Sequence, residues 1–309
     1  MKCAITGGAG FIGSHVVSAL RRAGHDVLIV DRNGEGVCQI DICDTTKLTD
    51  TLKAYNPDVI FHLAAVADAR KAFADPVESV NINVGGTASI LEAACQAGVA
   101  RLILASTVSV CGAMKRGFID ESEPFLPTGT GHIYSSTKAA CEFLVHDFYQ
   151  LYGLSFTILR YGTIYGPGMW PGLVLHSFLV NAFAGKPLVI YGDGSASRCF
   201  LFVEDLARAH ILALNNKAQN QTYNLQGPQS VTITELANVV SRLLGDVEIA
   251  YRQEASRFGD SQYEGREISS AKAYQELGWE PEVDIEEGVK RTIEWYQVNP
   301  ARFQVSMPD

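Results

Sequence analysis

Short apolar runs rich in β-branched residues alternate with longer stretches of helical spacing through the first half of the chain. The runs that we expect to form strands cover residues 3–6, 26–30, 58–63, 101–106 and 155–160. Between them, helical patterns extend over residues 11–23, 45–55, 76–97 and 134–152. This alternation predicts repeated β-α-β units, because parallel strands need a crossover connection that is usually a helix. The expected fold class is therefore α/β, with a Rossmann-like, doubly wound parallel sheet.

The pattern changes after Tyr161. Glycine and proline become dense in the segment YGTIYGPGMWPG, and short apolar runs then alternate irregularly. We expect residues 1–165 to form the sheet domain and residues 166–309 to form a smaller lobe. Segments near 195–225 are expected to return to the sheet, because the helical pattern that begins near Val203 is amphipathic.

Composition narrows the class of protein. Of the 309 residues, 47% are hydrophobic, enough for a large core, which excludes disorder as the main state. The formal net charge is -9, so the charge balance gives no sign of a nucleic-acid partner. The seven cysteines contain no CxxC pair, and no histidine accompanies them at metal-ligand spacing. No apolar stretch approaches the roughly 18 residues of a membrane span. We therefore expect a cytoplasmic protein with reduced thiols, no metal site and no membrane segment.

A glycine-rich turn, TGGAGFIG, joins the first predicted strand to the first predicted helix. Gly7 and Gly10 permit a tight turn and close approach of a pyrophosphate, and Gly13 lets the helix pack on the strand. Phe11 and Ile12 begin that helix, whose free N–H groups and positive dipole favour an anion. The turn therefore predicts a dinucleotide-binding site.

The end of the second predicted strand indicates which dinucleotide is bound. Asp31 stands where a carboxylate can accept hydrogen bonds from the adenosine ribose and would repel a 2′-phosphate. This favours NAD over NADP, although Arg32 beside it could also meet a phosphate. Further cofactor positions follow the next two strands: Asp41 and Ile42 near adenine, and Leu63, Ala64 and Ala65 at the carboxyl edge of the sheet. We expect His62 to be satisfied by the backbone and to have no role in proton transfer.

Tyr134 and Lys138 lie four residues apart on a predicted helix, so both side chains share one face. A tyrosine of ordinary pKa, about 10, needs a depression of roughly three units to act as a base at neutral pH. A neighbouring ammonium and a positively charged nicotinamide can together supply that shift. Lys138 would also hold the nicotinamide ribose. Thr107, at the end of the preceding strand, would hydrogen-bond the reacting oxygen; its alternative role is to cap the backbone.

Several motifs, in order, extend this pattern over nearly the whole chain: TGGAGFIG, Asp31, HLAA, Asn83 to Thr87, Ser106-Thr107, YSSTK, LRYGTIYGPG, YGDGSASRCFLFVEDLA and ELGWEP. Together they resemble the extended short-chain dehydrogenase/reductase family, in its nucleotide-sugar epimerase/dehydratase branch. The resemblance implies a tightly held NAD that is reduced and reoxidised within each turnover. It implies catalytic roles for Thr107, Tyr134 and Lys138, and places Asn83 and Tyr161 by the cofactor and the active-site helix. It also implies a homodimer, formed through the helices of residues 76–97 and 134–152.

The resemblance further implies that the C-terminal lobe holds a nucleoside diphosphate sugar. The matching positions are Arg198 on the diphosphate, Tyr191 near the base, Arg257 as a second phosphate ligand and Asp260 on the ribose. The segment from RFGD to SSAKA is two residues longer than usual in the family, so Arg266 competes with Arg257. The alternative for each arginine is a surface ion pair.

The residues after Thr107 separate the possible reactions. The family's dehydratases carry Asp-Glu there, as acid and base, and its decarboxylases a glutamate; this chain has Val108 and Ser109. Epimerisation at C4 needs neither group, so we predict a UDP-hexose 4-epimerase of the glucose/galactose type. Thr163 and Ser109 resemble the hydroxyl residues of UDP-glucuronate 4-epimerases, so epimerisation of UDP-glucuronate is the second prediction. A dehydratase or reductase remains open, as does a non-catalytic NAD(H) sensor, which the intact Thr107, Tyr134 and Lys138 disfavour.

Overall fold

The computed structural model describes residues 1–112, 117–125, 130–253 and 266–300. In this part of the chain the largest element is a seven-stranded sheet in the order β11-β7-β5-β4-β1-β2-β3, with every neighbouring pair parallel. Its strands are β1 (Lys2–Thr6), β2 (Asp26–Asp31), β3 (Cys38–Gln39), β4 (Val59–His62), β5 (Arg101–Thr107), β7 (Ser155–Tyr161) and β11 (Gln221–Leu225). The strand order reverses at β1, so β1 and β4 flank the crevice where ligands of doubly wound sheets collect. The predicted fold class is confirmed.

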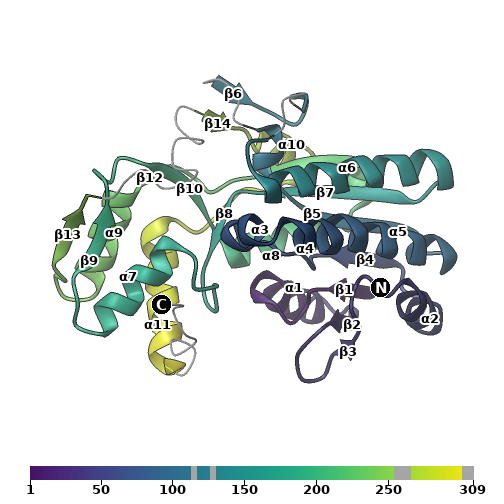
Figure 1. Ribbon diagram of the computed structural model, residues 1–309, viewed down its shortest axis with the longest axis horizontal. Coiled ribbons are helices and arrows are strands. Elements are labelled where there is room, and N and C mark those ends of the chain that lie inside the picture. Colours follow the sequence, from purple (N-terminus) through teal and green to yellow (C-terminus); the bar gives the residue numbers. More distant parts are fainter. Residues whose placement is uncertain (113–116, 126–129, 254–265, 301–309) are drawn as a thin grey trace.

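Helices cover both faces of this sheet (Figure 1). One face packs against α1 (Phe11–Arg22) and α8 (Val203–Leu212), and the other against α2 (Thr45–Tyr55), α5 (Gly86–Gln96) and α6 (Ile133–Tyr152). Successive strand residues point to opposite faces of the sheet. Because helices cover both faces, the interior strands carry apolar side chains on both sides. α8 and β11 both come from the segment that the sequence predicted to return to the sheet.

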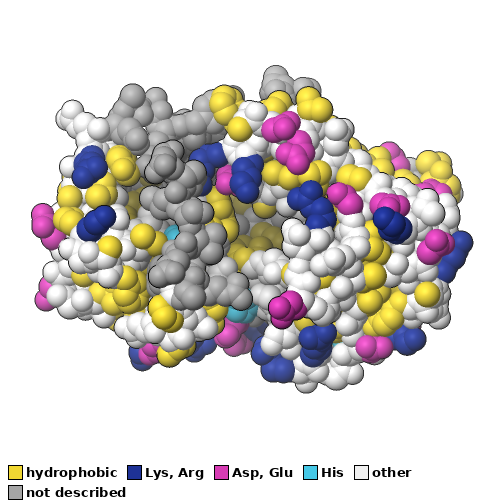
Figure 2. Space-filling view, turned by 60° about the horizontal axis from the view of Figure 1, so that its bottom comes forward, with side chains coloured by type: hydrophobic (Ala, Val, Ile, Leu, Met, Phe, Trp, Pro, Cys, Tyr) yellow, Lys and Arg dark blue, Asp and Glu magenta, His cyan; other side chains and the backbone are white. Residues whose placement is uncertain are grey.

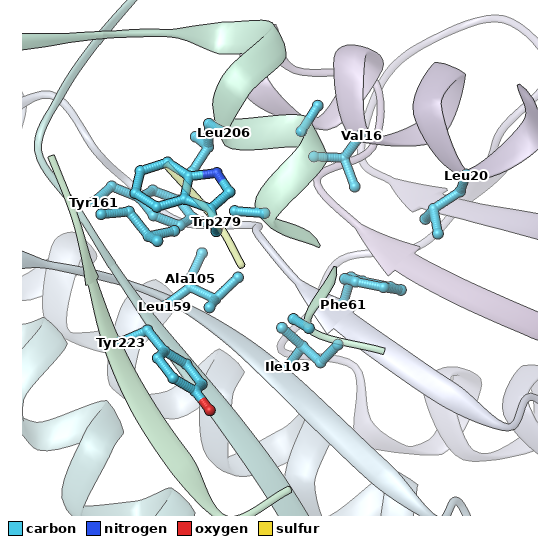
Figure 3. Packing of buried hydrophobic residues seen from close by; sticks show 14 of the residues in the cluster. Val16, Leu20, Phe61, Ile103, Ala105, Leu159, Tyr161, Leu206, Tyr223 and Trp279 are labelled. Carbon is cyan, nitrogen blue, oxygen red and sulfur yellow. The ribbon is translucent and has the colours of Figure 1, made fainter. Parts of the chain in front are cut away.

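The core on the α1 side also fastens the C-terminal region to the sheet. Figure 3 shows Trp279 beside Leu206 and Tyr161 in this cluster. Trp279 is fully buried, and its indole N–H donates to the carbonyl of Asp205 at 2.9 Å. Trp279 follows the short helix α10 (Ala271–Leu277). A large buried aromatic ring with its polar atom satisfied therefore anchors the region that follows β11.

The predicted helix of residues 76–97 is formed by three consecutive segments. It comprises α4 (Pro76–Val80), a π-helical stretch (Asn81–Gly85) and α5, and a short helix α3 (Ala69–Ala74) precedes it. Periodicity alone did not predict the π turn. Such turns widen a helix by one residue and are frequent at functional sites.

A second group of elements packs around its own core, at the left of Figure 1. It contains β8 (Thr163–Tyr165), β10 (Ser197–Phe202) and β12 (Ser230–Thr232) in one sheet, β9 (Leu188–Tyr191) with β13 (Ile249–Arg252) in another, and the helices α7 (Val174–Phe183), α9 (Ile233–Leu243) and α11 (Ile285–Val298). The strands β6 (Gly117–Ile119) and β14 (Arg266–Ile268) pair separately, and two short 3₁₀ turns, Val108–Cys111 and Asn216–Ala218, complete the described elements.

The division into domains at residue 165 stays a prediction. Among the described helices, none has both the length and the apolar character that crossing a bilayer requires.

Candidate functional site

A cleft of about 1000 Å³ runs along the carboxyl ends of the sheet strands and is closed on its other side by residues of the second group of elements. Figure 2 shows the surface hollowed between the two halves of the molecule. Most residues predicted for the site line this cleft: Gly7, Gly10, Phe11, Ile12, Gly13, Asp31, Arg32, Asp41, Ile42, Leu63, Ala64, Ala65, Thr107, Ser109, Tyr134, Tyr161, Thr163 and Arg198. The fold thus brings together the glycine turn, the hydroxyl residues and one of the predicted arginines.

The glycine turn has the backbone shape that a pyrophosphate site requires. Gly7 has φ +73, and a Cβ there would lie 2.7 Å from the backbone nitrogen of Ala64. A Cβ on Gly13 would lie 2.1 Å from the carbonyl oxygen of Gly7, so close packing excludes any larger residue. Gly10 offers no side chain to cap α1, which leaves the first N–H groups of the helix available to an anion.

Asp31, at the end of β2, contacts the same turn. Its carboxylate accepts a hydrogen bond from the backbone N–H of Ala9 at 3.0 Å. The guanidinium of Arg32 lies 4.0 Å from the carboxylate of Asp41, so an acidic side chain already faces it. A negatively charged group at Asp31 and a partnered arginine fit an unphosphorylated ribose better than a 2′-phosphate. The residues present therefore fit NAD.

His62 lies behind the turn and is fully buried. Its ring contacts the hydroxyl of Thr6 at 2.7 Å and the hydroxyl of Thr87 at 3.1 Å. The expectation that backbone groups satisfy this histidine was wrong, because two side-chain hydroxyls do so. Burial, together with the charge of Lys138, lowers the pKa of His62 to about 3, so the ring is neutral at physiological pH.

Thr107 ends β5 and Tyr134 lies in the first turn of α6, and both line the cleft. The Thr107 hydroxyl accepts a hydrogen bond from the N–H of Ser109 at 3.2 Å. It therefore caps the turn that follows the strand, and its own proton can still be donated to a ligand. The two roles considered for this hydroxyl are compatible.

Lys138 lies one helical turn beyond Tyr134, is 3% exposed and is not among the residues that line the cleft. Burial lowers the pKa of its ammonium group, while the nearby Cys141 and Glu142 raise it. Asn83 also lies outside the lining. Its side chain accepts from the N–H of Val66 at 2.7 Å and donates to the hydroxyl of Thr137 at 2.9 Å. It joins the loop after β4 to α6, and its predicted contact with the cofactor stays a prediction.

Only some of the residues predicted to bind the nucleotide sugar line the cleft. The guanidinium of Arg198 lines the cleft and donates to the carbonyl of Ser197 at 2.7 Å. Tyr191 ends β9, is 39% exposed and does not line the cleft. Arg257 and Asp260 lie outside the described residues, and Arg266 begins β14.

Several lining residues were not predicted as site residues. Lys71, His132, Trp170 and Gln226 belong to this set. The ring of His132 lies 6.4 Å from that of Tyr134, centroid to centroid, and burial lowers its pKa. The guanidinium of Arg70 lies 5.7 Å from the centre of the Trp170 ring. A sequence signal existed for His132, which immediately precedes the helix of Tyr134, whereas Gln226 is brought in only by the return of β11 to the sheet.

Comparison with known proteins identifies the family. A sequence model described as the NAD dependent epimerase/dehydratase family matches residues 3–225. The chain belongs to this family. A UDP-glucuronate 4-epimerase of Thermodesulfobacterium geofontis is 31% identical over 316 residues, covering 96% of each chain. A dTDP-glucose 4,6-dehydratase of Salmonella typhimurium is also 31% identical, over 97% of this chain and 93% of its own length. The crystal structure of a UDP-glucose 4-epimerase from Thermotoga maritima with UDP-glucose has a TM-score of 0.88 at 30% identity, covering 97% of this chain and 100% of its own.

These findings confirm the resemblance to the nucleotide-sugar branch of the extended short-chain dehydrogenase/reductase family, and NAD as its cofactor. The chain is thus an enzyme of the epimerase/dehydratase family. Because epimerases and dehydratases occur among relatives of similar identity, family membership does not select the reaction.

Proposed function

We propose that this protein is an NAD-dependent 4-epimerase of a UDP-hexose, of the glucose/galactose type. The observation that carries the proposal lies directly after Thr107 in the cleft. Val108 and Ser109 line the cleft where a dehydratase of this family would present a carboxylic acid and a carboxylate. An oxidising site without that pair supports reversible removal of hydride from C4, with no elimination of water.

The other carboxylates of the cleft do not replace the missing pair. Among the described lining residues, Asp31, Asp41, Asp68 and Asp75 each accept a hydrogen bond from a backbone N–H, at 2.9 to 3.0 Å. They hold turns or cap helices, and Glu78 lies in the first turn of α4. His132 also lines the cleft, but burial lowers its pKa, which disfavours the protonated ring that could donate to a leaving hydroxyl. The charge distribution therefore favours epimerisation over dehydration.

The chain's own residues would divide the work as follows. The Tyr134 phenolate takes the proton of the C4 hydroxyl, while Thr107 donates a hydrogen bond to the same oxygen. The Lys138 ammonium stabilises that phenolate and holds the nicotinamide ribose. NAD bound in this cleft would supply the acceptor for the C4 hydride and its donor for return to the opposite face of the sugar. Tyr134 then gives its proton back, so no solvent proton is required.

The remaining substrate contacts are proposals of the same kind. Arg198 would hold the diphosphate, because a fork of donors on a glycine-rich segment suits phosphate geometry. Arg257 or Arg266 would supply a second phosphate contact, Asp260 would hold the ribose and Tyr191 would contact the base. We keep residues 1–165 as the NAD-binding domain and residues 166–309 as the sugar-nucleotide lobe.

A second candidate is epimerisation of UDP-glucuronate. The hydroxyl residues Ser109 and Thr163 both line the cleft, where they could hydrogen-bond a sugar carboxylate. The relative from Thermodesulfobacterium geofontis carries that name. Val108 and the buried Met169 offer no such contact, so this substrate ranks second.

We also propose that the protein is a homodimer. Phe73, Val77, Val80 and Phe143 are 45 to 69% exposed on α3, α4 and α6. A cluster of exposed large apolar side chains on adjacent helices is typical of a protein interface, and a twofold axis would let the same helices cover one another.

The substrate assignment is tested by incubating the purified protein separately with UDP-glucose, UDP-N-acetylglucosamine and UDP-glucuronate and resolving the products by NMR. We expect UDP-galactose from UDP-glucose. Inversion of UDP-glucuronate alone would favour the second candidate. A 4-keto-6-deoxy product, or no inversion of any sugar, would contradict the epimerase proposal.

A further inference from the structure

A buried carboxylate lies behind the reacting residues. Glu142 is 1% exposed and follows Tyr134 and Lys138 along α6 at the same four-residue spacing, so the three side chains share one face of the helix. The hydroxyl of Ser106, on β5, donates to one oxygen of Glu142 at 2.5 Å.

The opposite charge comes from β7. Arg160 is 4% exposed, and its Nε donates to Glu142 Oε1 at 3.0 Å while its Nη2 donates to Oε2 at 2.7 Å. Two parallel charge-assisted hydrogen bonds fix both the distance and the orientation of the pair. One carboxylate therefore connects α6 to two neighbouring strands of the sheet.

Each partner of Glu142 is adjacent to a cleft residue. Ser106, which itself belongs to the cleft lining, precedes Thr107 on β5, and Arg160 precedes Tyr161 on β7. Because consecutive strand residues point to opposite faces, Ser106 and Arg160 face α6 on the side of the buried Leu104 and Ile158. Movement of the carboxylate would therefore change the spacing between the residues proposed to react.

We infer that Glu142 is a positioning residue: with Ser106 and Arg160 it sets α6 against β5 and β7, and its pairing with Arg160 keeps the buried charge behind Tyr134 balanced. The inference rests on the roles proposed for Tyr134 and Lys138. It assigns no contact with substrate or cofactor to Glu142.

The charges around this cluster support an electrostatic part in that role. Burial lowers the pKa of Lys138, and Glu142 raises it. The titratable and charged groups that act on the cluster come from every element packed against it: Cys141 on α6, His62 on β4, Arg160 and Tyr161 on β7, Cys111 after β5, and Glu121. Glu142 and Arg160 carry opposite charges, so removing either side chain leaves the charge of the other uncompensated.

A set of charge variants tests the inference. Glu142→Gln removes a negative charge and keeps the shape, so the apparent pKa of Tyr134 should fall by about one unit, for a charge roughly 12 Å along the helix in a medium of effective dielectric about 20. Arg160→Gln removes a positive charge and should raise it. The double variant should restore it. Ser106→Ala, a matched control without a charge change, should leave it in place.

The measurement is the ultraviolet titration of the phenolate in protein saturated with NAD and free of sugar, taken as the difference between each variant and the same variant carrying Tyr134→Phe. Equal values in all variants would overturn the electrostatic part. Because no sugar is present, the shifts can be found even if the wild-type protein inverts no sugar, in which case the proposed function fails while the electrostatic part of this inference stands.

Glu142→Asp tests the positioning part, and it decides the matter if the single Gln variants do not fold. It keeps the charge and shortens the side chain, so the bidentate pair with Arg160 is lost. We expect kcat to fall at least tenfold, with KM for the sugar nucleotide and the apparent pKa of Tyr134 unchanged. An unchanged kcat would overturn the inference.

Discussion

At the scale of single residues, the site joins structural and chemical roles in the same side chains. The Thr107 hydroxyl accepts from Ser109 and keeps its proton for a ligand. Lys138 is buried where its pKa is lowered, yet neighbouring groups on α6 act in the opposite direction. A phenol beside such an ammonium can lose its proton at a lower pH than in water. This is the chemical basis for treating Tyr134 as the base.

Replacing Tyr134 with phenylalanine removes the hydroxyl and keeps the ring. We expect the rate of epimerisation to fall at least about 100-fold, because proton transfer by a positioned base contributes about that much. Binding of NAD should change less than about threefold, since Gly7, Gly13 and Asp31 are unaltered. Steady-state kinetics and the absorbance of the bound cofactor measure the two quantities. Full turnover in this variant would remove Tyr134 from the role of base.

At the scale of elements, His62 connects three of them. Through its two ring nitrogens it contacts Thr6 on β1 and Thr87 on α5. Thr6 in turn accepts from the N–H of Ala64, in the segment that faces the glycine turn, at 3.3 Å. A neutral histidine therefore connects β1, β4 and α5 beneath the glycine turn of the proposed cofactor site.

This arrangement predicts a loss of stability in acid. The pKa of His62 is about 3 in the folded protein, against an ordinary 6.5, so between these values the unfolded chain binds more protons and stability falls as pH falls. From pH 7 to pH 5 the cost is about 2 kcal/mol, because stability falls by up to about 1.4 kcal/mol for each pH unit below 6.5.

Denaturant unfolding at pH 7 and pH 5 measures this effect. His62→Asn should lose about 2 kcal/mol less of its unfolding free energy than the wild type over that interval. It should be less stable at pH 7, because the contacts of the His62 ring with Thr6 and Thr87 are gone. His146→Asn, at an exposed position of α6, serves as the control and should follow the wild type. An equal loss in the His62 variant would contradict the assignment.

The elements also show what the sequence could predict. The order of strands and helices followed from apolar runs, and the glycine turn from residues whose chemistry is local. The π turn at Asn83 was not predicted, because apolar spacing does not distinguish one extra residue in a helix. The pair of Glu142 and Arg160 joins residues 18 positions apart, and only the packing of α6 on β7 brings them together. Tyr191 matched a motif, but it is not among the residues that line the cleft.

At the scale of the whole molecule, the cleft and the exposed apolar helices lie close together. Phe73 follows the loop that lines the cleft, and Val77 and Val80 continue along α4. The fold therefore places the proposed dimer interface next to the proposed active site, so that a partner subunit would cover α4 and α6.

A charged residue in that interface should separate the subunits. Val77 is 69% exposed, and Val77→Glu should convert a dimer to a monomer by placing carboxylates on both sides of the twofold axis. Val298→Glu is the matched control, because Val298 is 77% exposed at the end of α11, outside these helices. Sedimentation equilibrium reads the mass. A monomeric wild type, or a Val77 variant that remains dimeric, would exclude this interface.

The most direct measurement follows the hydrogen on carbon 4. UDP-glucose that carries deuterium at C4 is incubated with the NAD-loaded protein in ordinary water, and the products are resolved by NMR and mass spectrometry. We expect UDP-galactose with the deuterium still on C4, because the hydride leaves and returns within one site while Tyr134 handles only the hydroxyl proton. Loss of the label to solvent, or recovery of the sugar with its C4 configuration unchanged, would contradict the proposed reaction.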